Sequence, residues 1–305
     1  MTAHKISSPP TRPLLDGWEH FELYQNIRSA IATLPAYFRT ETRISGINVT
    51  DLQTLNTALG ATIEEQVVTT LNAIRHVWDP EERYSLYHFV RQAQTFPDVL
   101  LKRAVDSHIL LGIELKGWYV LAKEGEPSFR YRVTPAACAD ADLVVVVPWV
   151  LAQVISGSPI VFDPYVESAL FAAKFRNYHW RHLKKAKIDR TIRQPENVHP
   201  YPSKRDQIGD ISVGDQGNFG RFSRTGIMDA YLSEMKRRML CGVRIEHWLY
   251  FLQAFQETST EDEIRAGLGE LRGRIEREIR TAAEPIIDPV LAILAQLERL
   301  AGLID

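Results

Sequence analysis

Cysteine is scarce in this sequence, which has only Cys138 and Cys241 among 305 residues. A disulfide framework requires several cysteines, and a structural zinc site requires closely spaced pairs, so the sequence predicts neither. So low a cysteine content is typical of proteins from a reducing compartment. We therefore expect a cytoplasmic protein.

Long hydrophobic runs are missing as well. The longest apolar stretches are 142–155, which Pro148 and Gln153 interrupt, and 109–113. Because a helix needs about 20 apolar residues to span a bilayer, the sequence predicts no membrane-spanning helix. The first thirteen residues lack the apolar core of a signal peptide, and we interpret them as a loose arm. We expect no membrane among the partners.

Neither sign of charge dominates. Lys and Arg number 36 and Asp and Glu number 38, which gives a formal net charge of -2. Any binding to nucleic acid must therefore depend on a local concentration of positive charge. The hydrophobic fraction of 45% is ordinary for a folded globular protein. A chain of this length can form one large domain, or a catalytic domain with a helical extension.

Hydrophobic spacing predicts a helix followed by three strands. Apolar residues recur at helical intervals over 60–78, and Pro80 ends that helix. Aromatic and β-branched residues over 84–92 predict the first strand, and an apolar run over 108–121 predicts a strand buried on both faces. Between them, 96–101 is predicted to be a strand that begins with a proline. The residues of the helix face are Ile63, Val67, Leu71, Ile74 and Trp78.

A second helix and a fourth strand are expected to complete the sheet. The segment 129–133 is predicted to extend the meander of strands. Thr134 and Pro135 are typical of a helix start, so a helix is expected over 134–141. A buried strand over 142–151 follows. The predicted fold class is therefore α/β, with the order helix, three strands, helix, strand.

The remainder of the chain is predicted to be helical apart from one irregular region. A helix is expected over 163–176. Pro, Gly, Asn and Ser are frequent over 190–225, which predicts long loops of the kind that often carry function. Residues 228–305 are predicted to be helical. They include a broad apolar stripe near the end of the chain, made of Ile287, Val290, Leu291, Ile293, Leu294, Leu297 and Leu300.

Two carboxylates and a lysine occur on consecutive predicted strands. Asp98 follows a proline, and after fifteen intervening residues comes Glu114-Leu115-Lys116. Side chains two apart on a strand share a face, so Glu114 and Lys116 point the same way. Carboxylates on adjacent strands can hold a hard cation such as Mg²⁺, and the ammonium can orient or deprotonate a water and offset charge on a phosphate. The alternative is a solvated turn and strand face, although charges in so apolar a strand cost free energy unless they are paired.

The motif and the order of elements together resemble the PD-(D/E)xK nuclease superfamily over residues 62–149. The resemblance implies a restriction-endonuclease-like core with a mixed central sheet, to which N-terminal and C-terminal helices are added. It also implies a metal-dependent nuclease in which Asp98, Glu114 and Lys116 are catalytic. Its Mg²⁺ would be held by the two carboxylates and the backbone carbonyl of Leu115.

The superfamily often adds an acidic residue from the first helix. Glu64 and Glu65 are the candidates here, and Glu64 is favoured because it lies along one flank of the apolar stripe. Asp106 is an alternative to Asp98 as the first carboxylate, although it falls in a predicted turn. Two glutamines upstream of the motif either point toward the site or lie on the sheet surface: Gln92 and Gln94.

A basic run with interleaved aromatic residues occupies 174–193. This combination suits contact with phosphates along a groove, and the alternative is a solvated helix face. His179 and His182 have a spacing that could bind metal, but without a third ligand we expect them to stack or to contact phosphate. The residues of this run that we expect to contact DNA are Arg181, Lys184 and Lys185.

Polar loops within the irregular region carry residue types that pair with base edges. Arg and Lys suit guanine, Gln and Asn suit adenine, and Asp suits cytosine, although any polar loop contains such residues. We interpret these loops as a recognition segment. The candidates are Lys204, Arg205, Asp206, Gln207, Asn218, Arg221 and Arg224.

The sequence contains no GxxxxGK[ST] loop of the kind that binds ATP. Within the superfamily, a chain of this length with one catalytic motif and no such loop resembles the type II restriction endonucleases. The resemblance implies sequence-specific, Mg²⁺-dependent cleavage of double-stranded DNA by a homodimer, because two-fold symmetry matches a palindromic site. It also implies a cognate DNA methyltransferase in the same system, not bound as a subunit. A repair or structure-specific nuclease, and a non-catalytic DNA-binding module, are the alternatives.

We divide the chain into three segments. Residues 1–60 form an N-terminal arm with helices, 61–190 form the catalytic core, and 191–305 contain the recognition loops and a C-terminal helical part. The last segment is expected to form one compact unit with the core.

Overall fold

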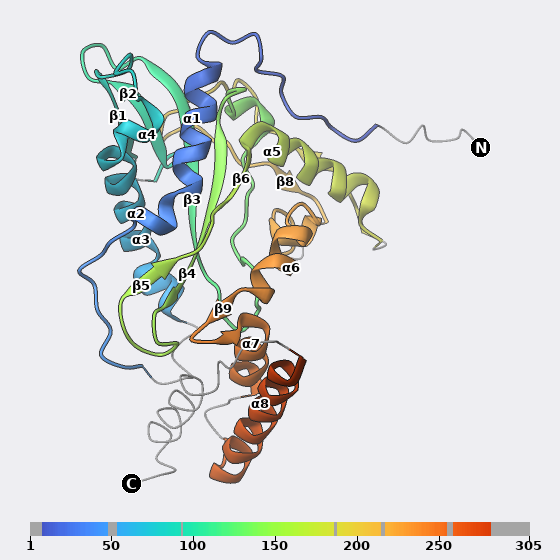
Figure 1. Cartoon of the computed structure of the whole chain (residues 1–305). Coiled ribbons are helices and arrows are strands. Elements are labelled where there is room, and N and C mark those ends of the chain that lie inside the picture. The colour runs from blue at the N-terminus through green and yellow to red at the C-terminus, as the bar shows by residue number, and fades with distance from the viewer. Residues whose placement is uncertain are drawn as a thin grey trace.

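The computed structural model describes residues 8–47, 54–92, 94–185, 188–214, 217–254 and 259–281. Figure 1 shows α1 to α4 gathered beside β1 to β3, α5 beside β6, and α7 and α8 continuing below the sheet. The helices are α1 (Phe21–Ala32), α2 (Leu34–Tyr37), α3 (Leu55–Ala73), α4 (Arg75–Trp78), α5 (Ala169–Tyr178), α6 (Asp229–Arg237), α7 (Ile245–Ala254) and α8 (Glu261–Thr281), with shorter turns η2 (Pro135–Ala137), η3 (His179–Leu183) and η4 (Ser223–Thr225). The strands are β1 (Tyr87–Arg91), β2 (Val99–Arg103), β3 (Ile109–Tyr119), β4 (Leu143–Leu151), β5 (Pro159–Val161), β6 (Tyr165–Ser168), β7 (Ile192–Arg193), β8 (Ile211–Ser212), β9 (Met239–Leu240) and β10 (Val243–Arg244).

A six-stranded mixed sheet forms the centre of the molecule. β1, β2 and β3 make an antiparallel meander, β3 pairs with β4 in parallel, and β4 also pairs with β5 and β6 in antiparallel fashion. All nine residues of β4 are buried, as expected of a central strand covered on both faces. The predicted α/β class with a mixed central sheet is confirmed.

The first predicted helix is confirmed, although it begins earlier, at Leu55, and breaks at Ile74 before α4. Its five face residues are at most 3% exposed. α3 packs against β3 and β1. A Cβ atom on Gly117 of β3 would lie 3.6 Å from the Cα atom of Gly60, so the helix and the strand are in van der Waals contact at this point.

The second predicted helix does not form. Its place is taken by the single 3-10 turn η2, after which Cys138 has an extended backbone. The reason is a tertiary contact: the Asp142 carboxylate accepts hydrogen bonds from the backbone N–H of Ala139 at 2.8 Å and of Gly112 at 2.7 Å. This bridge holds the segment beside β3 and outweighs the local helix-start signal.

The segment 129–133 does not extend the meander. It makes isolated bridges to Arg221 and Gly209 of the irregular region. Tyr131 directs it there, because its hydroxyl donates to the carbonyl of Ala169 and its carbonyl accepts from Arg176 of α5.

The predicted helix over 163–176 is half correct. Its first part is the strand β6, because Tyr165 and Val166 pair with Val146 and Val145 of β4. The helix α5 begins only at Ala169, where the hydroxyl of Ser168 accepts the N–H of Phe171 as an N-cap.

The irregular region is confirmed, since its described part contains only β7, β8 and η4 as regular elements. The C-terminal part is mostly helical, but a β9–β10 hairpin interrupts it. The turn residues Cys241 and Gly242 have φ angles of 52° and 76°, as a two-residue hairpin turn requires. The apolar stripe predicted near the end of the chain lies outside the described residues.

Within the described ranges, no helix is both long and apolar enough to cross a membrane.

Candidate active site

The candidate site forms where β2 and β3 part. Their pairing extends as far as Val99 opposite Ile113, and β3 then continues to Tyr119 without a ladder partner on β2. Pro97 turns the chain at this point, and its ring fits only because residue 112 is glycine: a Cβ there would lie 2.2 Å from the Pro97 Cγ atom. Asp98 therefore lies at the fork between two strands.

Side chains replace the missing ladder along the second half of β3. The backbone N–H of Leu115 donates to Asp98 Oδ2 at 3.0 Å, and that of Gly117 donates to Glu64 Oε1 at 3.3 Å. The N–H of Tyr119 donates to Asn56 Oδ1 at 2.9 Å. Alternate amides of β3 thus bind a carboxylate from the residue before β2 and two side chains from α3, which fixes the positions of all three.

Lys116 joins the two carboxylates predicted from the motif. Its Nζ atom lies 2.9 Å from Asp98 Oδ2 and 2.9 Å from Glu114 Oε1. The side chains of Lys116 and Asp98 are 24% and 25% exposed, whereas that of Glu114 is 11% exposed. The cluster is therefore sunk into the sheet but reachable from solvent on the Asp98 and Lys116 side.

Burial and charge set the ionisation of this cluster. Burial, together with the negative charge of Asp98, raises the pKa of Glu114 to about 7 against the opposing effect of Lys116. Burial by itself would lower the pKa of Lys116, but the charges and hydrogen bonds of Glu114 and Asp98 outweigh it and raise that pKa. Lys116 is therefore a positively charged hydrogen-bond donor near neutral pH, while Glu114 gains and loses its proton there.

The structure distinguishes the two glutamates of the first helix. Glu64 reaches the Gly117 amide, and burial raises its pKa, with Lys116 and Asp98 as the nearest charged influences. Glu65 is largely exposed, and its carboxylate lies 4.0 Å from Arg91. Arg91 also lies 3.6 Å from Glu64 Oε2. Glu64 thus belongs to the cluster, and Arg91 at the end of β1 flanks it.

The oxygen donors of this cluster fit a hard divalent cation. Glu114 Oε2 is buried and has no hydrogen-bond partner among the described residues, so it is an acceptor that a cation would satisfy. The Leu115 carbonyl faces the same edge as the Leu115 N–H and hence the same side as Asp98. No three His, Cys, Asp or Glu side chains of the described chain gather closely enough to hold a metal by themselves. Mg²⁺ does not need that many, because it keeps several waters and uses substrate phosphate oxygens.

Three other residues that the sequence offered as candidates do not join the contacts around Lys116. Asp106 lies in the β2–β3 turn and pairs with Arg103, away from the fork. The amide of Gln92 donates to the Pro97 carbonyl at 3.0 Å, which braces the turn before Asp98. Gln94 adopts a positive φ of 57° in the same turn.

The predicted DNA-contacting residues come from three separate segments. Arg181, Lys184 and Lys185 follow α5, and the Lys184 ammonium lies 3.9 Å from the ring centroid of Trp180. Residues 204–207 are exposed in the turn after Ser203. Two residues of the third segment are engaged by acidic side chains, since Arg221 pairs with Glu124 and Arg224 with Glu126, and Arg224 also donates to Asn218.

The two histidines of the basic run occupy different environments. His182 is exposed and packs against the Tyr178 ring at a centroid distance of 5.0 Å. His179 is half-buried, and burial followed by the Lys184 charge lowers its pKa. They are not part of any metal-binding group within the described residues.

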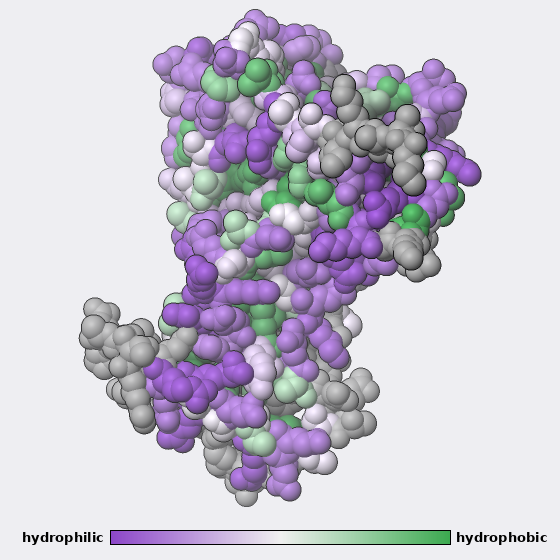
Figure 2. Space-filling model, turned by 90° about the vertical axis from the view of Figure 1, so that its right-hand side faces the viewer, coloured by the Kyte–Doolittle hydropathy of each residue, from purple (hydrophilic) through white to green (hydrophobic). Residues whose placement is uncertain are grey.

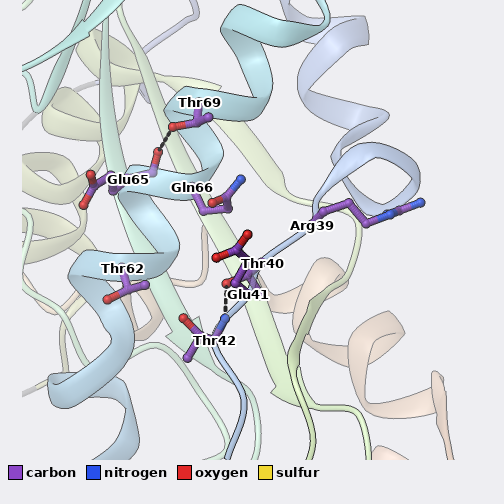
Figure 3. A pocket seen from close by; sticks show the side chains of 8 residues that line it. All are labelled: Arg39, Thr40, Glu41, Thr42, Thr62, Glu65, Gln66 and Thr69. Carbon is purple, nitrogen blue, oxygen red and sulfur yellow. Dashed lines mark hydrogen bonds between the residues drawn. The ribbon is translucent and has the colours of Figure 1, made fainter.

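A polar pocket of about 580 Å³ lies on the other flank of α3. Figure 3 shows Gln66 of α3 pointing toward Glu41 in the segment that follows α2, whereas the Glu65 side chain points away from that segment. Glu65 is among the residues that line this pocket, whereas Glu64 binds the Gly117 amide in the cluster. Its lining is Arg39, Thr40, Glu41, Thr42, Thr62, Glu65, Gln66 and Thr69.

Asn56 and Arg91 are the site neighbours that sequence reasoning missed. Neither belongs to a motif, and their proximity depends on how α3 and β1 pack around the fork.

Comparisons of the chain with protein-family models, with curated proteins and with solved structures find no match. The chemistry of the cluster is therefore inferred from its own geometry.

Proposed function

We propose that this chain is a Mg²⁺-dependent endonuclease that cuts double-stranded DNA at specific sequences, in the manner of a type II restriction endonuclease. The observation that carries the proposal is the contact of the Lys116 ammonium with both Asp98 and Glu114 at the fork of two strands. Fifteen residues separate Asp98 from Glu114 in the sequence, yet both contact Lys116 in one partly exposed cluster. Such a meeting of acids and a lysine is what metal-assisted phosphodiester hydrolysis requires.

The residues of the cluster have distinct proposed roles. Asp98, Glu114 and the Leu115 carbonyl would hold Mg²⁺, which supplies Lewis-acid polarisation of the scissile phosphate. Lys116 donates a hydrogen bond to the attacking water and offsets the charge that develops on the phosphate. Lys116 orients or deprotonates that water, as its contact with both carboxylates allows. Glu64 contributes a further negative charge and keeps the second half of β3 in place.

The proposed reaction is hydrolysis. The water oxygen forms a bond to phosphorus while the bond from phosphorus to the 3′ oxygen breaks, which leaves a 3′-hydroxyl and a 5′-phosphate. A homodimer would present two such sites to a palindromic sequence. A cognate DNA methyltransferase would act in the same system as a separate protein.

The test uses purified protein with unmethylated plasmid DNA and Mg²⁺. Discrete fragments that disappear with a chelator are expected, because cleavage needs both the metal and a defined sequence. Lys116→Ala should lose cleavage by at least about a hundredfold while it still binds DNA in the presence of Ca²⁺. Full activity in this variant, or no cleavage of several DNAs by folded wild-type protein, would contradict the proposal.

A repair or structure-specific nuclease is the second candidate, since the same cluster would serve it. Cleavage restricted to flaps, mismatches or ends would distinguish it from a restriction enzyme. A non-catalytic DNA-binding module is disfavoured by the intact contacts of Lys116 with its carboxylates.

A further inference from the structure

β7 and β8 form a short two-stranded ribbon with two distinct faces. Arg193 lies opposite Ile211, and Ile192 lies opposite Ser212. The N–H of Val213 donates to the Thr191 carbonyl at 3.0 Å, which continues the pairing by one residue. Because opposite residues in an antiparallel pair share a face, one face consists of Thr191, Arg193, Ile211 and Val213.

The other face of the ribbon is anchored. Ile192 is 8% exposed and packs in a small hydrophobic cluster with Trp180 and Phe219, separate from the main core. Ser212 is buried beside it. The ribbon is therefore fixed from behind, and only its outer face is open to a partner.

The backbone at the base of the ribbon is held by a buried ion pair. Asp210 accepts hydrogen bonds from Arg176 and from Asn177 of α5, and its N–H donates to the Arg132 carbonyl at 2.7 Å. Gly214 closes the other side, where a Cβ would lie 2.2 Å from the Asp189 carbonyl oxygen. These contacts give the outer face a defined orientation.

The outer face combines aliphatic side chains with positive charge. Ile211 and Val213 are 59% and 46% exposed, and Arg193 and Thr191 are exposed beside them. The surrounding segment is basic, with Asp189 as the acidic residue among its described members between 181 and 193. Figure 2 shows the side of the molecule that carries β8 and α6 as largely hydrophilic, with small hydrophobic areas among the polar side chains. The charge complements a polyanion, and the exposed aliphatic groups suit contact with bases.

We propose that the outer face of the β7–β8 ribbon enters a groove of double-stranded DNA and contacts base edges. A two-stranded ribbon fits the major groove, where a guanidinium can pair with guanine and an aliphatic side chain can contact the thymine methyl group. This inference rests on the proposed function and deepens it, because it names the element that reads the sequence.

The ribbon is also connected to the candidate active site. Arg176, which binds Asp210, donates from Nη1 to the Tyr131 carbonyl at 2.7 Å. Burial raises the pKa of the Tyr131 phenol, and Cys138 and the negative charge of Glu114 raise it further. Asp210 at the base of the ribbon is thus linked to Tyr131 through Arg176, and Glu114 of the cluster acts on the same residue through its charge.

The test measures DNA binding with Ca²⁺ in place of Mg²⁺, by fluorescence anisotropy on a short duplex that contains a sequence cut by the wild-type protein. Arg193→Ala is expected to weaken binding about tenfold, and Val213→Glu by more, because it brings a negative charge to the DNA. The matched controls are Arg83→Ala, whose guanidinium pairs with Glu22, and Val105→Glu, in the exposed β2–β3 turn. Both controls should bind as the wild type does.

Each outcome separates the ribbon from the proposed function. If the wild-type protein cuts DNA but Arg193→Ala and Val213→Glu bind it normally, the ribbon inference is wrong and the nuclease proposal stands. If the folded wild-type protein neither binds nor cuts DNA, the proposed function itself fails. Sedimentation equilibrium adds a third arm: a change from dimer to monomer in Val213→Glu, with DNA affinity retained, would make the ribbon an interface between copies and overturn the inference.

Discussion

Two clusters in this molecule each join a cation to a carboxylate, and they differ in access to solvent. In the first, Arg176 and Asp210 are 2% and 0% exposed. In the second, Lys116 and Asp98 are 24% and 25% exposed. The guanidinium of Arg176 also donates to two backbone carbonyls and to Asn177, whereas the ammonium of Lys116 contacts carboxylates.

The difference separates a structural ion pair from a site for chemistry. Arg176 ties α5 to the chain at 131–133 and to Asp210, so all its directions are used within the fold. Lys116 contacts two carboxylates, and its side chain and that of Asp98 remain partly exposed to solvent. One buried oxygen of Glu114 has no hydrogen-bond partner in the described chain. The buried Arg176–Asp210 pair holds the backbone in place. The partly exposed Lys116–Asp98 pair leaves room for a ligand to replace one of the two partners.

The largest expected effect concerns the stability that each cation supplies. Arg176→Met should lower the free energy of unfolding by about 3–5 kcal/mol, because it leaves Asp210 buried without its counter-charge. Lys116→Met should cost less, because that cluster is partly solvated and Glu114, whose pKa is raised to about 7, can take up a proton when its counter-charge is lost. Urea unfolding followed by circular dichroism measures both. The double variant Arg176→Met, Asp210→Leu should recover most of the loss, and equal losses in the two single variants would remove the distinction between the clusters.

The second effect is on metal binding as a function of pH. Burial raises the pKa of Glu114 to about 7, so its proton must leave before it can bind a cation. Affinity for Mg²⁺ should therefore fall about tenfold for each unit of pH below 7 and level off above it. The same shift means that the contribution of Glu114 to stability is present below its ordinary pKa and is lost as the pH rises through about 7. Calorimetric Mg²⁺ titrations across this range test the prediction, and in Glu114→Gln the remaining affinity should not vary with pH.

The smallest expected effect separates two adjacent glutamates. Glu64→Gln should slow DNA cleavage about tenfold, because it removes a charge beside Lys116 and Asp98. Glu65→Gln serves as its matched control and should leave the rate unchanged, since its carboxylate is largely exposed and solvent screens its charge. Rates from a plasmid nicking assay decide the matter, and equal losses in the two variants would place both carboxylates in the site.

Local patterns predicted the parts of the fold that depend on periodicity. The apolar face of α3 and the buried run of β4 are visible as spacing and composition, and both formed as expected. The same periodicity favoured Glu64, which the structure places against the Gly117 amide. The motif likewise gave Asp98, Glu114 and Lys116, which lie in contact.

The rest depends on contacts between distant segments, which no local pattern contains. The helix expected over 134–141 has a proper start signal, but Asp142 binds Gly112 and the Tyr201 hydroxyl and holds the chain extended. Asn56 and Arg91 approach the cluster only because β2 leaves β3 at Val99. Of the residues on the ribbon face, Arg193 ends the basic run seen in the sequence, but the grouping with Ile211 and Val213 follows from a pairing across a long loop.

The capping of β3 by side chains has a practical consequence for preparing inactive protein. A half-strand whose amides were left bare would be an edge onto which another chain could add, and such edges promote aggregation. Asp98→Ala would expose the Leu115 amide in this way, whereas Asp98→Asn keeps an oxygen that can accept it. Asp98→Asn is therefore the better choice for a variant of the cluster that must stay monodisperse in a concentrated sample.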